Sequence, residues 1–565
     1  MTYIKIGHIF FIKRITNNIF TDNKNILFVR WCTMRNIYSK KFILVLIAVI
    51  IIYLGIINNE IYRDKEVFIE KGDEVEISII PKPLSYDSKE GNFILTKDSS
   101  IYIKGNTDEE TEEIKWVAEF LREKLRIATG FQLNIIEGDK LVKGSIYLTT
   151  INSNEDQGIE GYTMKTTPEI IEIIAYKPEG ISRGVQTLRQ IFPSEIDKNT
   201  IVTGVEWSVP ASIINDKPEY SYRGLMIDVA RHFFTVDEVK RQIDLAAQYK
   251  INRVHLHLSD DQGWRLEIKK YPDLTLIGGS TEVGGGPGGY YTQEEFKDIV
   301  RFAMQRYVEI IPEFDMPGHT NAALASYGFL NPDGKRAALY TGIKVGFSSF
   351  MTHSEKTYEF IDDVFKEVSQ ISPSKYLQIG GDEALSTKKE DYNYFVGRVA
   401  KIAQKYDKTP IGWDPIDTSP EIDSSVILQN WQDSNAEARK KEMKMVISIA
   451  EKAYLDMKYG EGIPKDFGLD WAGYIPVEKA YNWDPTDYAP KNLVLGVEAP
   501  LWTETIATQE QMDYMIYPRL LGYAEIGWTP KANRNWDEYK IRLRNQGERL
   551  ENEGVNYYKD PAIWE

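Results

Sequence analysis

The chain has 565 residues, of which 42% are hydrophobic and 27% are charged, the composition of a globular protein of two or three domains. Its net charge of −16 argues against nucleic acid as a partner, because phosphate binding requires basic patches. The single cysteine, Cys32, excludes an internal disulfide, so packing has to supply the stability.

The amino-terminal part is basic and then apolar. Residues 1–41 contain eight Lys or Arg and one acidic residue, and residues 42–59 carry no charge. We expect a basic flank without fixed structure at 1–41, a signal or signal-anchor segment at 42–59 and a linker at 60–74. Because no Ala-x-Ala site follows, an uncleaved anchor is favoured. Basic residues before the segment then place the protein at the cell surface, with secretion as the alternative.

Two domains are predicted after the linker. Between residues 75 and 212 short strand and helix patterns mix, which is typical of a small α+β domain. From 213 to 550 strand and helix patterns alternate and end in a helical run at 509–526, and a tail follows at 551–565. The eight predicted strands are 223–229, 252–258, 309–314, 376–379, 410–413, 426–431, 445–449 and 493–497.

This alternation predicts a (β/α)8 barrel, the TIM-barrel class of α/β folds. A doubly wound sheet is the alternative. The barrel is favoured because polar residues follow nearly every strand, as a ring of active-site loops requires.

The strand at 376–379 runs into Gly380-Gly381-Asp382-Glu383. The glycines allow a sharp turn, and two adjacent carboxylates then lie at a strand end, where barrel enzymes place their sites. Because two like charges this close cannot both ionise easily, we expect one pKa to be raised. A protonated acid beside an ionised one is typical of glycoside hydrolysis, and helix capping by the pair is the alternative.

Histidines and carboxylates also follow the second and third barrel strands. His255, His257, Asp315 and His319 could suggest a metal site. Pairing between carboxylates and histidines explains the same residues without an ion and is favoured.

In combination, these motifs resemble family 20 of the glycoside hydrolases, the β-N-acetylhexosaminidases. The resemblance covers residues 75 to 550, including the α+β domain. It rests on Arg223-Gly224, Asp228 with Arg231-His232-Phe233, 255–265, 312–319, 380–383, Gly412-Trp413-Asp414, Trp431, Tyr454-Leu455-Asp456 and 501–504.

The resemblance implies retaining, substrate-assisted hydrolysis, in which the 2-acetamido oxygen of the substrate attacks the anomeric carbon. It implies that Glu383 acts as general acid and then base. Asp382 would hold the acetamido N–H and stabilise the oxazolinium charge, and Tyr454 would donate to the acetamido oxygen. Neither a metal nor another cofactor is implied. The substrates would be oligosaccharides or glycoconjugates ending in N-acetylhexosamine.

Other residues carry over as sugar contacts. Arg223 resembles the donor to the hydroxyls at the non-reducing end, and Asp456 and Glu504 resemble acceptors for the 4- and 6-hydroxyls. The expected aromatic walls are Trp413, Trp431 and Trp502.

Three further residues are predicted to support this site. Asp261 and His319 resemble a relay behind Glu383, with Asp260 as a close competitor of Asp261. Asp315 is expected to support the acids rather than to react.

One position departs from the family. Its members usually have histidine two residues before the paired glycines, and this chain has Gln378. Glutamine cannot take a proton near neutral pH, so the pH profile is put in doubt while activity should survive.

The alternatives to a β-N-acetylhexosaminidase are a sugar-binding module without activity, a disaccharide-releasing member of the family and a metal hydrolase.

Overall fold

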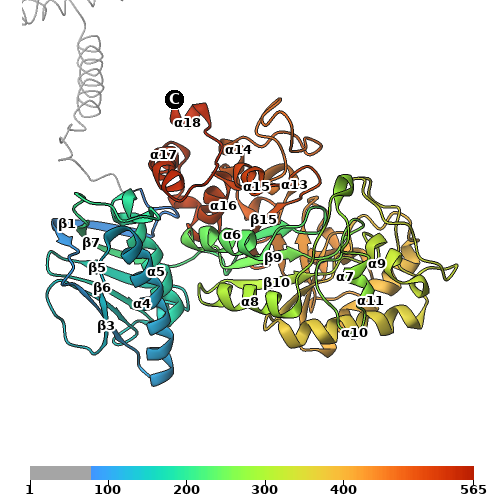
Figure 1. The fold of residues 1–565 in the computed structure, drawn as a ribbon, viewed down its shortest axis with the longest axis horizontal. Coiled ribbons are helices and arrows are strands. Elements are labelled where there is room, and N and C mark those ends of the chain that lie inside the picture. The colour runs from blue at the N-terminus through green and yellow to red at the C-terminus, as the bar shows by residue number, and fades with distance from the viewer. Residues whose placement is uncertain (1–77) are drawn as a thin grey trace, which may run out of the picture. The chain divides into compact units, whose positions relative to one another are not determined.

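The structure, a computed structural model, describes residues 78–565. The predicted flank, the signal or anchor segment at 42–59 and the linker at 60–74 therefore lie outside the described residues. None of the helices between residues 78 and 565 combines the length and hydropathy that a bilayer span requires. A seven-stranded sheet is followed along the chain by a closed eight-stranded barrel (Figure 1).

The sheet belongs to a small α+β domain, as predicted. Its strand order is β1-β7-β5-β6-β4-β2-β3, with parallel pairs in one half and antiparallel pairs in the other. Helices α4 (Asp108–Thr129) and α5 (Pro178–Ile191) pack against it side by side. The strands are β1 (Ser85–Ile94), β2 (Ser100–Lys104), β3 (Asn134–Glu137), β4 (Ser145–Thr149), β5 (Tyr162–Thr166), β6 (Ile170–Ala175) and β7 (Ser208–Asp216).

Eight parallel strands then close into the barrel, which confirms the predicted fold class. Every predicted barrel strand coincides with an observed one. In barrel order the strands are β8 (Tyr222–Asp228), β9 (Arg253–His257), β10 (Glu309–Glu313), β11 (Tyr376–Gln378), β12 (Thr409–Trp413), β13 (Ile427–Asn430), β14 (Met445–Ile447) and β15 (Val494–Leu501).

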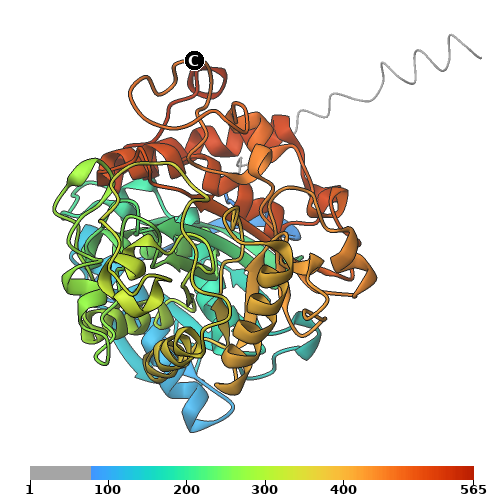
Figure 2. The same ribbon diagram turned by 90° about the vertical axis from the view of Figure 1, so that its right-hand side faces the viewer.

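Helices surround these strands, and α10 and α11 are prominent in yellow and orange in Figure 2. The predicted helix at 509–526 is two helices, because Pro518 has no backbone N–H to continue the first. The main helices are α6 (Val236–Gln248), α8 (Gln293–Met304), α10 (Glu355–Ile371), α11 (Lys389–Lys405), α15 (Gln509–Ile516), α16 (Arg519–Trp528) and α17 (Trp536–Asn552). Shorter helices are α7 (Asp273–Leu276), α9 (Asn321–Ser326), α12 (Ala436–Lys440), α13 (Ala450–Ala453), α14 (Val477–Tyr481) and α18 (Pro561–Trp564).

The barrel interior changes character along its axis. One layer is apolar and is built by Tyr222, Ile311, Tyr376, Ile411, Ile427 and Val446. One pleat further toward the carboxyl ends of the strands, the inward side chains are polar and hydrogen-bonded to one another, as at His255, Gln429 and Glu498. Buried polar groups are retained only where partners satisfy them. The barrel is therefore apolar at one end and carries a connected polar network toward the other.

A buried ion cluster joins the α+β domain to the amino-terminal end of the barrel. Glu160 of the small domain accepts from Arg183 Nε at 2.9 Å and from Arg223 Nη1 at 3.1 Å. Arg223 also donates to the carbonyl oxygens of Tyr220 and Lys250. Removing one member of such a cluster leaves an uncompensated buried charge, which costs about 3–5 kcal/mol. Arg223 thus holds two domains together.

Candidate active site

The acid pair lies in a strained turn directly after β11. Gly380, Gly381 and Glu383 all have positive φ, at 68°, 109° and 43°. A Cβ on Gly380 would lie 1.7 Å from Asp315 Oδ1, so only glycine fits there. Gln378 supports the turn, because its Oε1 accepts the N–H of Gly380 at 2.9 Å. The turn projects both carboxyl groups above the barrel.

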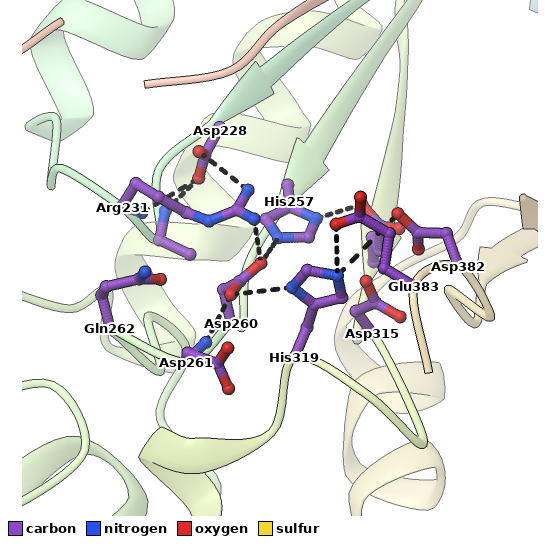
Figure 3. A network of polar contacts seen from close by, with 12 residues as sticks. Asp228, Arg231, His257, Asp260, Asp261, Gln262, Asp315, His319, Asp382 and Glu383 are labelled. Atoms are coloured by element: carbon purple, nitrogen blue, oxygen red, sulfur yellow. Dashed lines mark hydrogen bonds and ion pairs between the residues drawn. The ribbon is translucent and has the colours of Figure 1, made fainter. Parts of the chain in front are cut away.

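Asp382 lies beside a second buried carboxyl group, that of Asp315 (Figure 3). Burial and the charge of Asp382 raise the pKa of Asp315 well above its ordinary value. Burial and the neighbouring charges of Glu383 and Glu313 also raise the pKa of Asp382. Asp315 accepts the N–H of Gly381 at 3.0 Å and so supports the turn, while Asp382 Oδ1 has no hydrogen-bond partner and can face a ligand.

A histidine lies behind Glu383. His319 Nε2 is 3.5 Å from Glu383 Oε2, and His319 Nδ1 is 3.2 Å from Asp260 Oδ1 (Figure 3). Burial lowers the pKa of His319, but the charges of Asp260 and Asp315 outweigh it and raise this pKa well above the ordinary value. The imidazole is therefore held charged and oriented, with one N–H directed at the exposed acid.

Aromatic rings enclose a cavity of about 350 Å³ beside the acid pair. The ring of Tyr454 stacks on Trp431 with centroids 6.1 Å apart, and Trp502 lies 6.2 Å from Tyr454. Burial and the charges of Asp382 and Asp456 raise the pKa of Tyr454 well above its ordinary value. Its phenol therefore stays protonated and can donate a hydrogen bond. Three aromatic faces and one hydroxyl suit a ligand with both C–H faces and acceptor atoms.

Two carboxylates in the same cavity have buried oxygen atoms without a hydrogen-bond partner. Both oxygens of Asp456 and Oε2 of Glu504 are buried without a hydrogen bond. Arg231 lies beside them, 4.0 Å from Glu504, and is paired with Asp228 and Asp260. Buried acceptors without donors are costly unless a ligand supplies the donors. A compound with several hydroxyl groups has the required chemistry.

Comparison with known proteins identifies the family. The profile of the glycosyl hydrolase family 20 catalytic domain matches residues 220–531, and the profile of domain 2 of the same family matches residues 76–217. The chain belongs to glycosyl hydrolase family 20. It is therefore a glycoside hydrolase, as the sequence motifs predicted.

Other family 20 proteins match over most of the chain. A β-N-acetylhexosaminidase of Cellulomonas fimi is 35% identical, over 86% of this chain and 97% of its own length. The structure of the family 20 β-N-acetylhexosaminidase from Streptomyces coelicolor A3(2) has 43% identity and a TM-score of 0.81, covering 86% of this chain and 98% of that one. The Streptomyces plicatus N-acetyl-β-hexosaminidase bound to Thio-NAglucal has 44% identity and a TM-score of 0.80, covering 87% of this chain and 98% of that one.

The structure brings most of the predicted family 20 residues to one cavity. Eight of the predicted residues line it: His319, Asp382, Glu383, Trp431, Tyr454, Asp456, Trp502 and Glu504. Trp413 does not line the cavity. It is fully buried beneath Trp502, with ring centroids 5.7 Å apart, and its Nε1 donates to Glu313 Oε1 at 2.7 Å. Trp413 thus supports a wall without forming one.

The prediction for Arg223 is wrong. Arg223 is the second residue of strand β8, and its guanidinium is bound by Glu160 and by two carbonyl oxygens at the opposite end of the barrel. Arg231 occupies the cavity in its place. The sequence could have indicated Arg231, because this residue follows the carboxyl end of the strand, where barrel sites are built. Trp471, which also lines the cavity, comes from a long loop after β14 that carries no strand pattern.

The relay prediction is corrected in the same way. Asp260, and not Asp261, faces His319 (Figure 3). Asp261 Oδ1 instead accepts from Ser348 Oγ at 2.5 Å and from the N–H of Asn321 at 2.9 Å. It fixes the loop around Ser348 rather than the acid.

The relay continues into the barrel as an alternating series of carboxylates and imidazoles. Glu313 Oε2 lies 2.9 Å from His255 Nε2 and contacts His257 Nδ1, and His257 Nε2 is 2.9 Å from Asp260 Oδ2. At the far end His255 Nδ1 lies 2.9 Å from Glu498 Oε1. The series is Glu498, His255, Glu313, His257, Asp260, His319 and Glu383. His255 and His257 are both paired with carboxylates, which is the interpretation that the sequence favoured for these histidines.

Replacing Asp260 with asparagine keeps the shape of the relay and removes its charge. We expect kcat for glycoside hydrolysis to fall by roughly 10²-fold, the scale of a general acid that has lost its orientation. Because the charge of Asp260 raises the pKa of His319, that pKa falls in the variant and the imidazole loses its proton at lower pH. The pKa of His319, followed by NMR titration of its imidazole, should therefore be lower than in the wild type by about 1–3 units.

The matched control is Asp261→Asn, which changes the neighbouring carboxylate in the same way. It should leave the pKa of His319 unchanged. An unchanged pKa of His319 in Asp260→Asn, or equal shifts in both variants, would contradict the assignment of the relay to Asp260.

Proposed function

We propose that this chain is an exo-acting β-N-acetylhexosaminidase. It removes terminal N-acetylglucosamine or N-acetylgalactosamine from glycans with retention of configuration. The observation that carries the proposal is the convergence of Asp382, Glu383 and Tyr454 on one aromatic cavity with unpaired carboxylates. At about 350 Å³ the cavity is near the small end for ligand sites, which favours one sugar ring over two.

The proposed reaction uses the acetamido group of the substrate as the nucleophile. Asp382 Oδ1 is buried and has no hydrogen-bond partner, so it can accept the acetamido N–H. The protonated Tyr454 donates to the acetamido oxygen and aims it at the anomeric carbon. An internal nucleophile held at attack distance avoids the entropy cost of recruiting one. As the C–O bond to the leaving group breaks, the negative Asp382 stabilises the oxazolinium charge.

Glu383 supplies the proton. It protonates the leaving oxygen in the first step and takes a proton from the attacking water in the second. About a third of its side chain is exposed, which gives both the leaving group and water access to it. Asp456, Glu504 and Arg231 line the same cavity and are suited to bind the sugar hydroxyls.

Two variants and a chromogenic N-acetylglucosaminide test the proposal. Glu383→Gln should lower kcat/KM by roughly 10²–10⁴-fold because it cannot transfer a proton. Asp382→Asn should also lower it steeply, because a neutral amide no longer offsets the oxazolinium charge. Glu390→Gln, an exposed glutamate seven residues from Glu383, should match the wild type.

The outcomes separate the alternatives. A wild type that binds the sugar without cleaving it would indicate a binding module. Release of a disaccharide from a longer chito-oligosaccharide would indicate a disaccharide-releasing member of the family. Activity that is lost with chelators and restored with a metal ion would support a metal hydrolase.

We also propose that the enzyme works on the outer side of a membrane, attached through residues 42–59 or released after them. The support is sequence alone: a charge-free segment after eight basic residues. The full chain should sediment with membranes, and a chain that starts at residue 60 should not. Equal amounts of the two chains in the membrane fraction would contradict the proposed anchor.

A further inference from the structure

Apolar side chains gather at the mouth of the cavity, on the side of Glu383. Ile343 and Val345 line the cavity itself and are 49% and 37% exposed. Phe347, in the same loop, is 45% exposed, and Leu385, two residues after Glu383, is 77% exposed. Ile343, Val345, Phe347 and Leu385 are named here the apolar rim. Large apolar side chains left exposed together at a site mark a binding surface.

The apolar rim is a built surface. Gly346 has φ +77°, and a Cβ there would lie 2.7 Å from Leu385 Cδ1, so the two segments are in direct contact. Ser386 Oγ donates to the carbonyl oxygen of Ser348 at 3.0 Å, and the hydroxyls of Ser349 and Thr387 are 2.6 Å apart. These bonds tie the loop at 339–350 to the segment that carries the acid.

The segment after β9 holds the loop at 339–350 through two further hydrogen bonds. Asp261 accepts from Ser348 Oγ, and Gln262 Nε2 donates to the carbonyl oxygen of Gly342 at 2.8 Å. Asp260, which orients His319, belongs to that segment. The loop therefore has a fixed position relative to the acid, and this gives Asp261 a role apart from the relay.

The cavity is lined by residues of two kinds. Asp456, Glu504 and Arg231 are charged and suited to hydroxyl groups. Ile343 and Val345 are apolar, and Gly346, which follows Val345, contacts Leu385, two residues after Glu383. A general acid must face the leaving oxygen, so the aglycone has to leave the cavity on that side.

We propose that the apolar rim is a subsite for an apolar aglycone. The enzyme then prefers N-acetylhexosaminides whose leaving group carries an alkyl or aryl chain next to the glycosidic oxygen. This inference rests on the proposed function, because it takes Glu383 as the acid and the cavity as the sugar site. It adds the class of leaving group, which the sugar-binding residues do not determine.

A matched pair of substrates tests the subsite. Methyl and octyl N-acetyl-β-glucosaminide present the same sugar, the same bond and simple primary alkoxide leaving groups, and differ only in apolar surface. Each buried CH₂ group strengthens binding about fourfold. Burial of two or three such groups predicts that kcat/KM for the octyl glycoside exceeds that for the methyl glycoside by at least about tenfold.

The variant Leu385→Ser should reduce the octyl-to-methyl ratio severalfold and leave hydrolysis of the methyl glycoside unchanged. Because Leu385 is largely exposed, its replacement removes little packing from the folded protein. Leu141→Ser removes a similarly exposed leucine from the α+β domain and should leave both substrates unaffected. A wild-type ratio near one, or equal losses on both substrates in Leu385→Ser, would overturn the subsite.

Binding separates this inference from the proposed function. The Glu383→Gln variant should bind the octyl glycoside about tenfold more tightly than the methyl glycoside in calorimetry, whether or not the wild type turns over. Equal affinities would reject the apolar rim as a subsite. Failure of the wild type on a chromogenic N-acetylglucosaminide would reject the activity alone.

Discussion

The site depends on a buried series of alternating carboxylates and imidazoles that runs from Glu498 to Glu383. Burial opposes charge on His255, but Glu498 and Glu313 outweigh it and raise the pKa of His255 to about 9. The pKa of His257 is raised well above its ordinary value by Glu313 and Asp260, again against burial. Both imidazoles are therefore charged at neutral pH. A carboxylate lies close to each nitrogen atom of both rings, so the position of His319 behind the acid is set by groups deep in the barrel.

This series explains why the barrel interior is polar toward its carboxyl end. Aliphatic side chains would pack there at less cost, since buried ion pairs recover little more than their desolvation penalty. Removing one partner, however, would leave a charge without compensation. The network thus contributes less to net stability than to holding one geometry. Gln378 belongs to the same layer, because its Nε2 donates to Gln429 Oε1 at 2.9 Å and Gln429 donates to Glu498. At the position where the family usually has histidine, glutamine still connects the turn of the acids to the network.

The amino-terminal end of the barrel contributes to stability, and the carboxyl end carries the candidate active site. At the amino-terminal end Glu160 pairs with Arg183 and Arg223 and attaches the α+β domain. At the carboxyl end Arg231 faces the cavity. Arg223 and Arg231 are eight residues apart: Arg223 is near the start of strand β8, and Arg231 lies in the loop that follows its end.

Sequence patterns predicted the barrel because each strand is a short apolar run followed by polar residues. They also placed the acid pair at a strand end, whereas Tyr454 was predicted from the resemblance to family 20 alone. They did not predict which of two adjacent aspartates faces inward, because Asp260 and Asp261 differ only in the direction that the loop gives them. Strand β1 could not be predicted from such patterns, because most of its residues are exposed and it pairs with β7 far along the chain. Trp471 and the apolar rim come from long loops, whose course depends on tertiary contacts.

Substrate assistance is the central claim, and fluorination of the acetamido group tests it most directly. Fluorine withdraws electron density from the carbonyl oxygen and weakens it as a nucleophile, while the leaving group stays the same. The account predicts that kcat/KM for 4-nitrophenyl glycosides falls steeply and successively from the acetamido to the mono-, di- and trifluoroacetamido substrate. A rate that does not change along this series would show that the acetamido oxygen does not attack, and would contradict the account.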